Sequence, residues 1–208
     1  CIRLLVRERH FIQEILDGHP SLGSPVFWEY KDTPPLSPPV GEFLYAFPTL
    51  TLGVSPVITL VASKFFLPAL LFLLVYLFVW RLSGAEHVPE SKLTALAAAF
   101  FITLGYDLID YRTVWSFLTG AASPGSFLLW ARPVNPILGA LFLFSFLLSV
   151  LALYERTERR KSNVLAAAAF LAFMFGSYFF SWGIAVSVLA ALILLLLLRK
   201  EYRTACTL

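Results

Sequence analysis

The sequence predicts an all-α fold, a polytopic bundle of about five transmembrane helices with an external amphipathic helix and a Gly/Pro-rich loop. Three observations predict it. The chain of 208 residues is 59% hydrophobic and 14% charged, whereas soluble domains average about 25% charged residues. Its apolar residues gather in runs that approach the length a helix needs to cross about 30 Å of hydrocarbon. None of these runs alternates apolar and polar residues, as strands of an outer-membrane barrel do.

This composition excludes a soluble enzyme, a nucleic-acid-binding domain and a disordered tail. The lipid bilayer is therefore an expected partner, and no nucleic acid is expected. Cys1 and Cys206 stand at opposite ends of the chain, so their spacing supports neither a disulfide framework nor a metal site. Because the chain begins with Cys1 and shows no signal-peptide pattern, we expect it to be an internal fragment of a longer protein.

The transmembrane bundle is expected over residues 57–208. Its five spans cover about residues 57–80, 93–109, 134–154, 163–180 and 183–198. The loops on one side of these spans hold most of the basic residues: Arg81, Lys92, Arg156, Arg159, Arg160, Lys161, Arg199, Lys200 and Arg203. The side richer in Lys and Arg is cytoplasmic. The sequence therefore predicts a multi-pass protein of the plasma (inner) membrane, with residues 1–56 and the loop from about 110 to 133 extracytoplasmic.

The external region, residues 1–56, is expected to have two parts. Residues 2–17 carry apolar side chains at helical spacing and predict an amphipathic helix. Residues 18–56 are rich in Gly and Pro, which break helices and favour turns. They also carry six aromatic residues, Phe27, Trp28, Tyr30, Phe43, Tyr45 and Phe47. Since Trp and Tyr collect at the lipid interface, we expect this loop to pack on the bundle or to lie at that interface.

Glu8 is the first candidate site residue. On an ideal helix it falls within the apolar stripe of Leu4, Leu5, Phe11, Ile12, Ile15 and Leu16. A carboxylate there is costly unless it is paired, protonated or part of a site. The alternative is a helix that begins near Arg9 and leaves Glu8 in water. The opposite face predicts an ordinary wet surface, with Arg3, Arg7, His10, Glu14 and Asp17.

Asp107 and Asp110 form the second candidate site. The apolar run 93–106 is too short to cross, so a spanning helix has to continue to about Asp110. Asp107 then lies at the outer edge of the hydrocarbon, where an ionisable residue is a functional candidate. The two carboxylates share a helix face and suit a divalent cation, Mg²⁺ or Mn²⁺, or a general base. The alternative is a helix that ends at Gly105, with both aspartates among the headgroups.

Three basic residues near the outer ends of the spans are candidates for contact with a phosphate: Arg132, Arg112 and Lys64. Arg132 stands just ahead of the third span, where a lipid phosphate would lie. The commoner role of such an arginine is to anchor a helix end to the headgroups. Lys64 lies in the first turns of the first span and is expected to extend toward the interface.

Several stretches carry a family resemblance. They are residues 14–20 (EILDGHP) followed by residues 25–31 (PVFWEYK), then residues 131–136 (ARPVNP) ahead of a span and residues 176–182 (GSYFFSW) between two spans. With these stretches the chain resembles the GT-C superfamily, polytopic glycosyltransferases that use polyprenyl-phosphate-linked sugars. The first two stretches look like the first external loop of bacterial and archaeal members.

The resemblance implies transfer of a sugar from a polyprenyl-phosphate donor to an acceptor at the external membrane face. It implies a catalytic carboxylate, for which Glu8 and Asp107 are the candidates, and donor-phosphate contacts at Arg132, Arg112 and Lys64. It also implies a further span upstream of residue 1. The alternative is a non-catalytic polytopic membrane protein: an inactive family member, a scaffold or a transporter subunit.

The expected topology leads to a labelling prediction. Single cysteines placed at Ser24 and at Ser162 should react with a membrane-impermeant thiol reagent from opposite sides of the membrane, because the basic residues put these positions on different sides. Labelling of intact cells and of inverted vesicles measures this. Reaction of both positions from the same side would contradict the topology.

Overall fold

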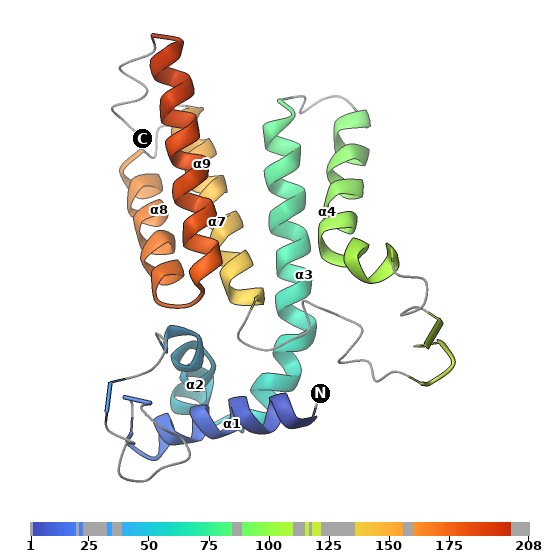
Figure 1. Ribbon diagram of the computed structural model, residues 1–208, viewed down its shortest axis with the longest axis vertical. Coiled ribbons are helices and arrows are strands. Elements are labelled where there is room, and N and C mark those ends of the chain that lie inside the picture. The colour runs from blue at the N-terminus through green and yellow to red at the C-terminus, as the bar shows by residue number, and fades with distance from the viewer. Residues whose placement is uncertain are drawn as a thin grey trace. The chain divides into compact units, whose positions relative to one another are not determined.

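The computed structural model describes residues 2–19, 21–22, 33–34, 39–84, 89–109, 115–116, 118–121, 136–155 and 160–200. The regular elements within these ranges are α-helices, which confirms the predicted all-α class. They are α1 (Ile2–Leu16), α2 (Val40–Leu52), α3 (Pro56–Leu82), α4 (Pro89–Ile109), α7 (Ile137–Tyr154), α8 (Arg160–Phe175) and α9 (Phe179–Leu198), as Figure 1 shows.

The chain divides into two compact units, and each is described by itself. The first unit comprises residues 1–70 and 100–138, and the second comprises residues 71–99 and 139–208. The first unit therefore holds α1, α2, the first half of α3 and the last half of α4. The second unit holds the other halves of α3 and α4 together with α7, α8 and α9.

Among the described residues, three helices are long and apolar enough to cross a membrane, rather than the five expected. They are α3, α7 and residues Phe180–Leu198 of α9. The expected spans 93–109 and 163–180 form as α4 and α8. α8 has 16 residues and ends at Phe175, so its rise of about 24 Å falls short of the hydrocarbon thickness. In α4 the apolar run is confined between Lys92 and Asp107.

The Gly/Pro-rich region contains a helix that the sequence analysis missed. α2 occupies residues 40–52 although Pro39 precedes it and Pro48 lies within it. A proline just before a helix removes no helical hydrogen bond, because the first N–H groups of a helix have no acceptor within it. Pro48 removes one bond, and the helix continues for another turn before Gly53 ends it in the left-handed region at φ 66°. The number of prolines in this region therefore did not predict whether a helix forms, because their positions relative to the helix decide which hydrogen bonds are lost.

The predicted helix over residues 2–17 is confirmed by α1, whose end has a specific cause. Gly18 has φ 92°, a conformation that glycine adopts without steric cost. Its N–H donates to the carbonyl of Ile15 at 3.3 Å, and the N–H of His19 donates to the carbonyl of Glu14 at 2.9 Å. These two bonds form a Schellman motif, which satisfies carbonyls at the helix end and turns the chain back.

The core of the first unit is built where α1 packs against α2. α1 buries Ile12 and Ile15, and α2 buries Tyr45 and Ala46. Leu22, just after the turn at Gly18, is also buried and holds a left-handed backbone at φ 48°. Such a conformation costs a leucine about 1–2 kcal/mol, so the burial of its side chain has to offset that cost.

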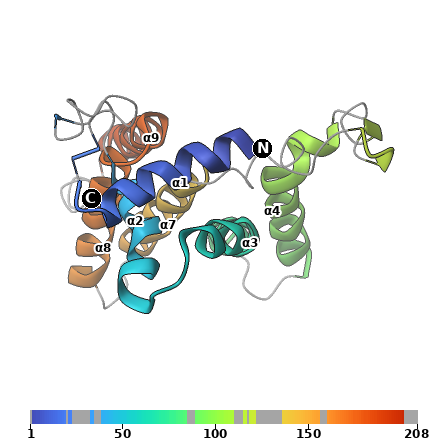
Figure 2. The same cartoon turned by 90° about the horizontal axis from the view of Figure 1, so that it is seen from below.

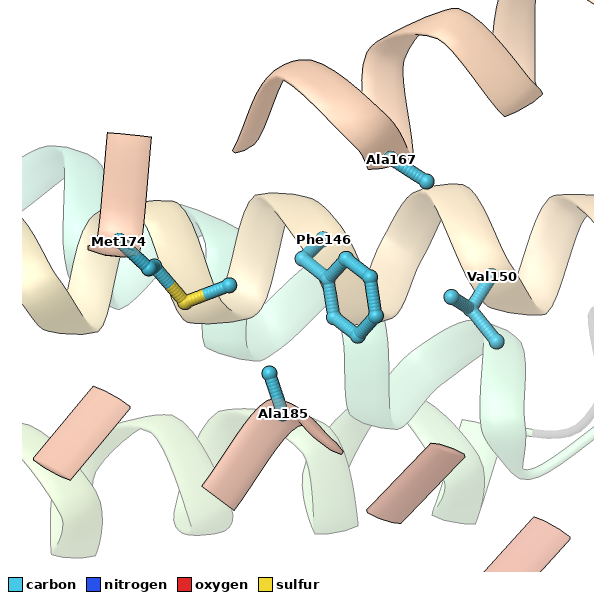
Figure 3. Packing of buried hydrophobic residues seen from close by; sticks show 5 residues of the cluster. All are labelled: Phe146, Val150, Ala167, Met174 and Ala185. Carbon is cyan, nitrogen blue, oxygen red and sulfur yellow. The ribbon is translucent and has the colours of Figure 1, made fainter. Parts of the chain in front are cut away.

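The core of the second unit joins three helices. Phe146 and Val150 of α7, Ala167 and Met174 of α8, and Ala185 of α9 form one buried cluster, shown in Figure 3. Stacking of Phe142 on Phe173, with ring centroids 5.3 Å apart, extends the contact between α7 and α8. The connection of α8 to α9 is tight and aromatic: Phe175 stacks on Trp182 across it at 4.6 Å.

Gly139 allows the closest approach within the second unit. A Cβ atom at this position of α7 would overlap the Oγ of Ser181 and would lie 3.0 Å from two carbon atoms of Tyr178. Small residues permit such close helix contacts in membrane proteins. The contact brings the start of α7 to the start of α9, so the two helices run in the same direction and α8 runs back between them (Figure 1).

This contact predicts a difference between two glycines. Gly139→Ala should destabilise the protein by about 1–3 kcal/mol, because Tyr178 and Ser181 must move to accept the methyl group. Gly183→Ala is the matched control, since nothing lies within 4 Å of a Cβ there and alanine favours a helix. Thermal unfolding of the purified protein in detergent measures both. An equal change of Tm in the two variants would contradict the close contact.

Candidate functional site

The candidate site residues all fall within the sequence ranges of the first unit. Positions 8 and 64 lie in the range 1–70, and positions 107, 110, 112 and 132 lie in the range 100–138. Of these six, the structure describes the side chain of Lys64 and the helical backbone at Glu8 and Asp107. Asp110, Arg112 and Arg132 lie outside the described residues. The second unit contains none of the six.

Glu8 belongs to a helix that begins well before it. α1 starts at Ile2, so the alternative of a helix beginning near Arg9 does not hold. Position 8 lies one helical turn before Ile12, which is fully buried, and within two turns of Ile15, which is also buried. By helical register, position 8 therefore belongs to the face that α1 buries.

Asp107 lies in the last turn of α4. Because α4 continues to Ile109, the alternative of a helix ending at Gly105 does not hold. Small buried residues recur at every fourth position of this helix: Ser91, Ala95, Ala99 and Thr103. Position 107 is the next member of that series and lies one helical turn after the buried Thr103. This four-residue spacing was readable from the sequence and gives the position of Asp107 a more specific context than helix length alone.

Lys64 is partly buried on α3, between more exposed apolar neighbours. Phe65 and Phe66 are 74% and 73% exposed, as expected for side chains that face lipid. Pro68, one turn later, has no N–H, so the carbonyl of Lys64 lacks its usual helical donor. Lys64 lies about 12 Å along the helix from Pro56, which is within reach of the interface for a long ammonium side chain.

Glu14 is not on a wet surface, contrary to the sequence prediction. His10 and Asp17 are exposed as expected, and Gln13 donates to Asp17 at 2.9 Å on that exposed face. Glu14 is only partly exposed, and its Oε2 is shielded from solvent. The Schellman turn follows directly: the N–H of His19 donates to the carbonyl of Glu14, and the N–H of Leu22 donates to the carbonyl of His19. Gly18 was the sequence signal for this turn, because glycine is common just after the end of a helix.

A metal-binding cluster is not found among the described residues: no group of three or more His, Cys, Asp and Glu side chains lies close enough to hold an ion. The pairing of Asp107 with Asp110 therefore rests on their spacing of three positions, which places them on the same side of a helix if it continues to Asp110.

The second unit has charge at one end and none at the other among its described residues. Arg81, at the end of α3, approaches Glu155, just after α7, with 3.5 Å between Nη2 and Oε2. The start of α8 and the end of α9 add the cations Arg160, Lys161, Arg199 and Lys200. The opposite end, around Gly139, Tyr178 and Ser181, holds aromatic and small residues. This polarity agrees with the expected difference between the two membrane faces.

Comparisons with known proteins add no assignment to this geometry. No protein-family model, curated protein or solved structure matches the chain.

Proposed function

We propose that the chain is part of an integral-membrane glycosyltransferase that moves a sugar from a polyprenyl-phosphate donor to an acceptor at the external membrane face. The observation that carries the proposal is that the three candidate positions the structure describes, 8, 64 and 107, come from two ranges far apart in sequence and belong to one compact unit. The resemblance of residues 14–20, 25–31 and 131–136 to the GT-C superfamily supplies the chemistry.

Five crossings are part of this proposal, and two contacts support them. The Arg81–Glu155 ion pair puts the ends of α3 and α7 on the same side. In the proposal the chain between them crosses back once, and α4 is the helix assigned to that crossing. The contact of Gly139 with Ser181 likewise makes α7 and α9 parallel, so α8 returns between them. A helix shorter than the bilayer is accommodated by local thinning or by its basic ends.

The carboxylates at positions 8 and 107 have the role of general base in this proposal. A carboxylate takes the proton of the acceptor hydroxyl, and the hydroxyl oxygen bonds to the anomeric carbon of the sugar. The bond between that carbon and the phosphate oxygen breaks, and the polyprenyl phosphate leaves with the electron pair. Two positions in the helices support the role: position 8 shares the helical register of the buried Ile12, and position 107 lies one turn after the buried Thr103.

The donor phosphate is assigned to Arg132, Arg112 and Lys64. Arginine binds phosphate oxygens through two parallel N–H donors, whereas lysine acts as a point charge. These cations would stabilise the negative charge of the leaving phosphate. A divalent cation, Mg²⁺ or Mn²⁺, at Asp107 and Asp110 belongs to the same proposal, with its other ligands drawn from phosphate and water.

Asp107→Asn is the sharpest test of the proposed base. The full-length protein is placed in membrane vesicles with polyprenyl-phosphate mannose or glucose carrying a radioactive sugar, and transfer to membrane or soluble acceptors is counted. The variant should lose at least about a hundredfold in rate, because a general base contributes about 10²–10⁴-fold. Asp17→Asn, on the exposed face of α1, is the matched control and should transfer at the wild-type rate.

Glu8→Gln separates the two carboxylates. If Glu8 is the base and Asp107 only a ligand of the cation, both variants lose transfer, and excess Mg²⁺ or Mn²⁺ restores part of it in Asp107→Asn alone. Transfer at the wild-type rate by the variant that carries both substitutions would overturn the assignment of the base to these residues. Absence of both donor binding and transfer in the wild type would favour the non-catalytic alternative.

A further inference from the structure

We propose that α1 and α2 form a two-layer module on the membrane surface, in which α2 inserts Phe43, Phe47 and Leu50 into the boundary between lipid headgroups and acyl chains. In this module α1 lies on the water side of α2. The occupant of the apolar face of α2 is thus the bilayer. The inference rests on the packing of the first unit and does not depend on the proposed glycosyl transfer.

The two faces of α2 are both apolar, and only one of them is covered. Gly41, Tyr45 and Ala46 are buried. Phe43, Phe47 and Leu50 lie at spacings of four and three residues, so they form one stripe along the helix, and they are 39%, 63% and 62% exposed. Large apolar side chains exposed in a row mark a surface that another apolar phase covers.

The outer face of α1 has the opposite character. α1 packs against α2 and buries Ile12 and Ile15. Its exposed residues are polar or charged: Arg9, His10, Gln13 and Asp17. The pair therefore has water-compatible side chains on the outer side of α1 and lipid-compatible side chains on the outer side of α2. Such a separation of polar from large apolar exposed side chains is expected when one side of the pair faces water and the other faces an apolar phase.

The connection to α3 places α2 at the edge of the hydrocarbon. Residues 53–55 join the two helices and span at most about 11 Å when extended. Val57, Ile58 and Val61 at the start of α3 are apolar and exposed, so the hydrocarbon begins within the first turns of α3. With 13 residues, α2 is about 20 Å long and cannot itself cross.

The direction of the helices agrees with a position along the surface. In Figure 2 the first half of α3, which belongs to the same unit, is seen nearly end-on, while α1 and α2 lie across the view. If α3 crosses the bilayer, α1 and α2 run roughly along its surface. α2 has Glu42 in its first turn and no basic residue. Its attachment therefore depends on apolar burial rather than on anionic lipid, unlike that of a basic amphipathic helix.

Spin labels measure the depth of each face. The full-length protein, with Cys1 and Cys206 replaced by serine, receives a single labelled cysteine at Phe47, Gln13 or Phe65 and is reconstituted in phosphatidylcholine vesicles. The label at position 47 should collide several-fold more with oxygen, which dissolves in lipid, than with a water-soluble nickel chelate. Position 13 should show the reverse, and position 65, within the candidate span α3, serves as the lipid reference.

Two results would overturn the inference. Equal access of the nickel chelate to positions 47 and 13 would put the stripe of α2 in water. Protection of position 47 from both reagents would show that protein, such as a partner or a second copy, covers the stripe. Added phosphatidylglycerol should leave the depth of position 47 unchanged, and a shift of that position toward the acyl chains would contradict attachment by apolar burial alone. Loss of glycosyl transfer has no bearing on any of these outcomes.

Discussion

Backbone hydrogen bonding in hydrocarbon is the constraint on which the rest of this structure depends. Each N–H and C=O group within a bilayer needs a partner from the protein, and a helix supplies all of these partners within a single segment. The side chains of α3 and α9 can then be apolar on nearly every side, and their exposed residues Phe65, Phe66, Leu194 and Leu198 need no protein partner. The window of α7, by contrast, is 50% buried, and it carries both the close contact at Gly139 and the cluster around Phe146.

The sequence was informative where one physical effect dominates. Segments 57–80 and 134–154 were identified because apolar length alone decides whether a helix can cross, and the structure extends or trims them by a few residues. The Schellman end of α1 follows from the local chemistry of Gly18. Both kinds of signal are contained within a single element, so no knowledge of tertiary packing was needed to read them.

The sequence was less informative where two effects compete. α2 forms although prolines flank and interrupt it, because burial of Tyr45 and Ala46 against α1 outweighs one missing hydrogen bond. Glu14 was assigned to the wet face by its angle on the helix, yet its side chain is only partly exposed and its Oε2 is shielded from solvent. Of the candidate site, the sequence could indicate which residue types lie near the ends of spans. The distances among them depend on tertiary packing, which helical spacing does not encode.

The uncharged turn between α8 and α9 has a consequence for how the protein enters the membrane. Residues 176–178 carry no charge, while Arg160 and Lys161 begin α8 and Arg199 and Lys200 follow α9. Moving this turn through the bilayer dehydrates no charged side chain. Moving the start of α8 or the end of α9 through it would dehydrate two cations. In the proposed arrangement, in which α8 crosses, the pair is suited to insert in one step as a helical hairpin, led by its aromatic tip. The direction of insertion then follows from the free energy of dehydration, which is lowest for the uncharged turn.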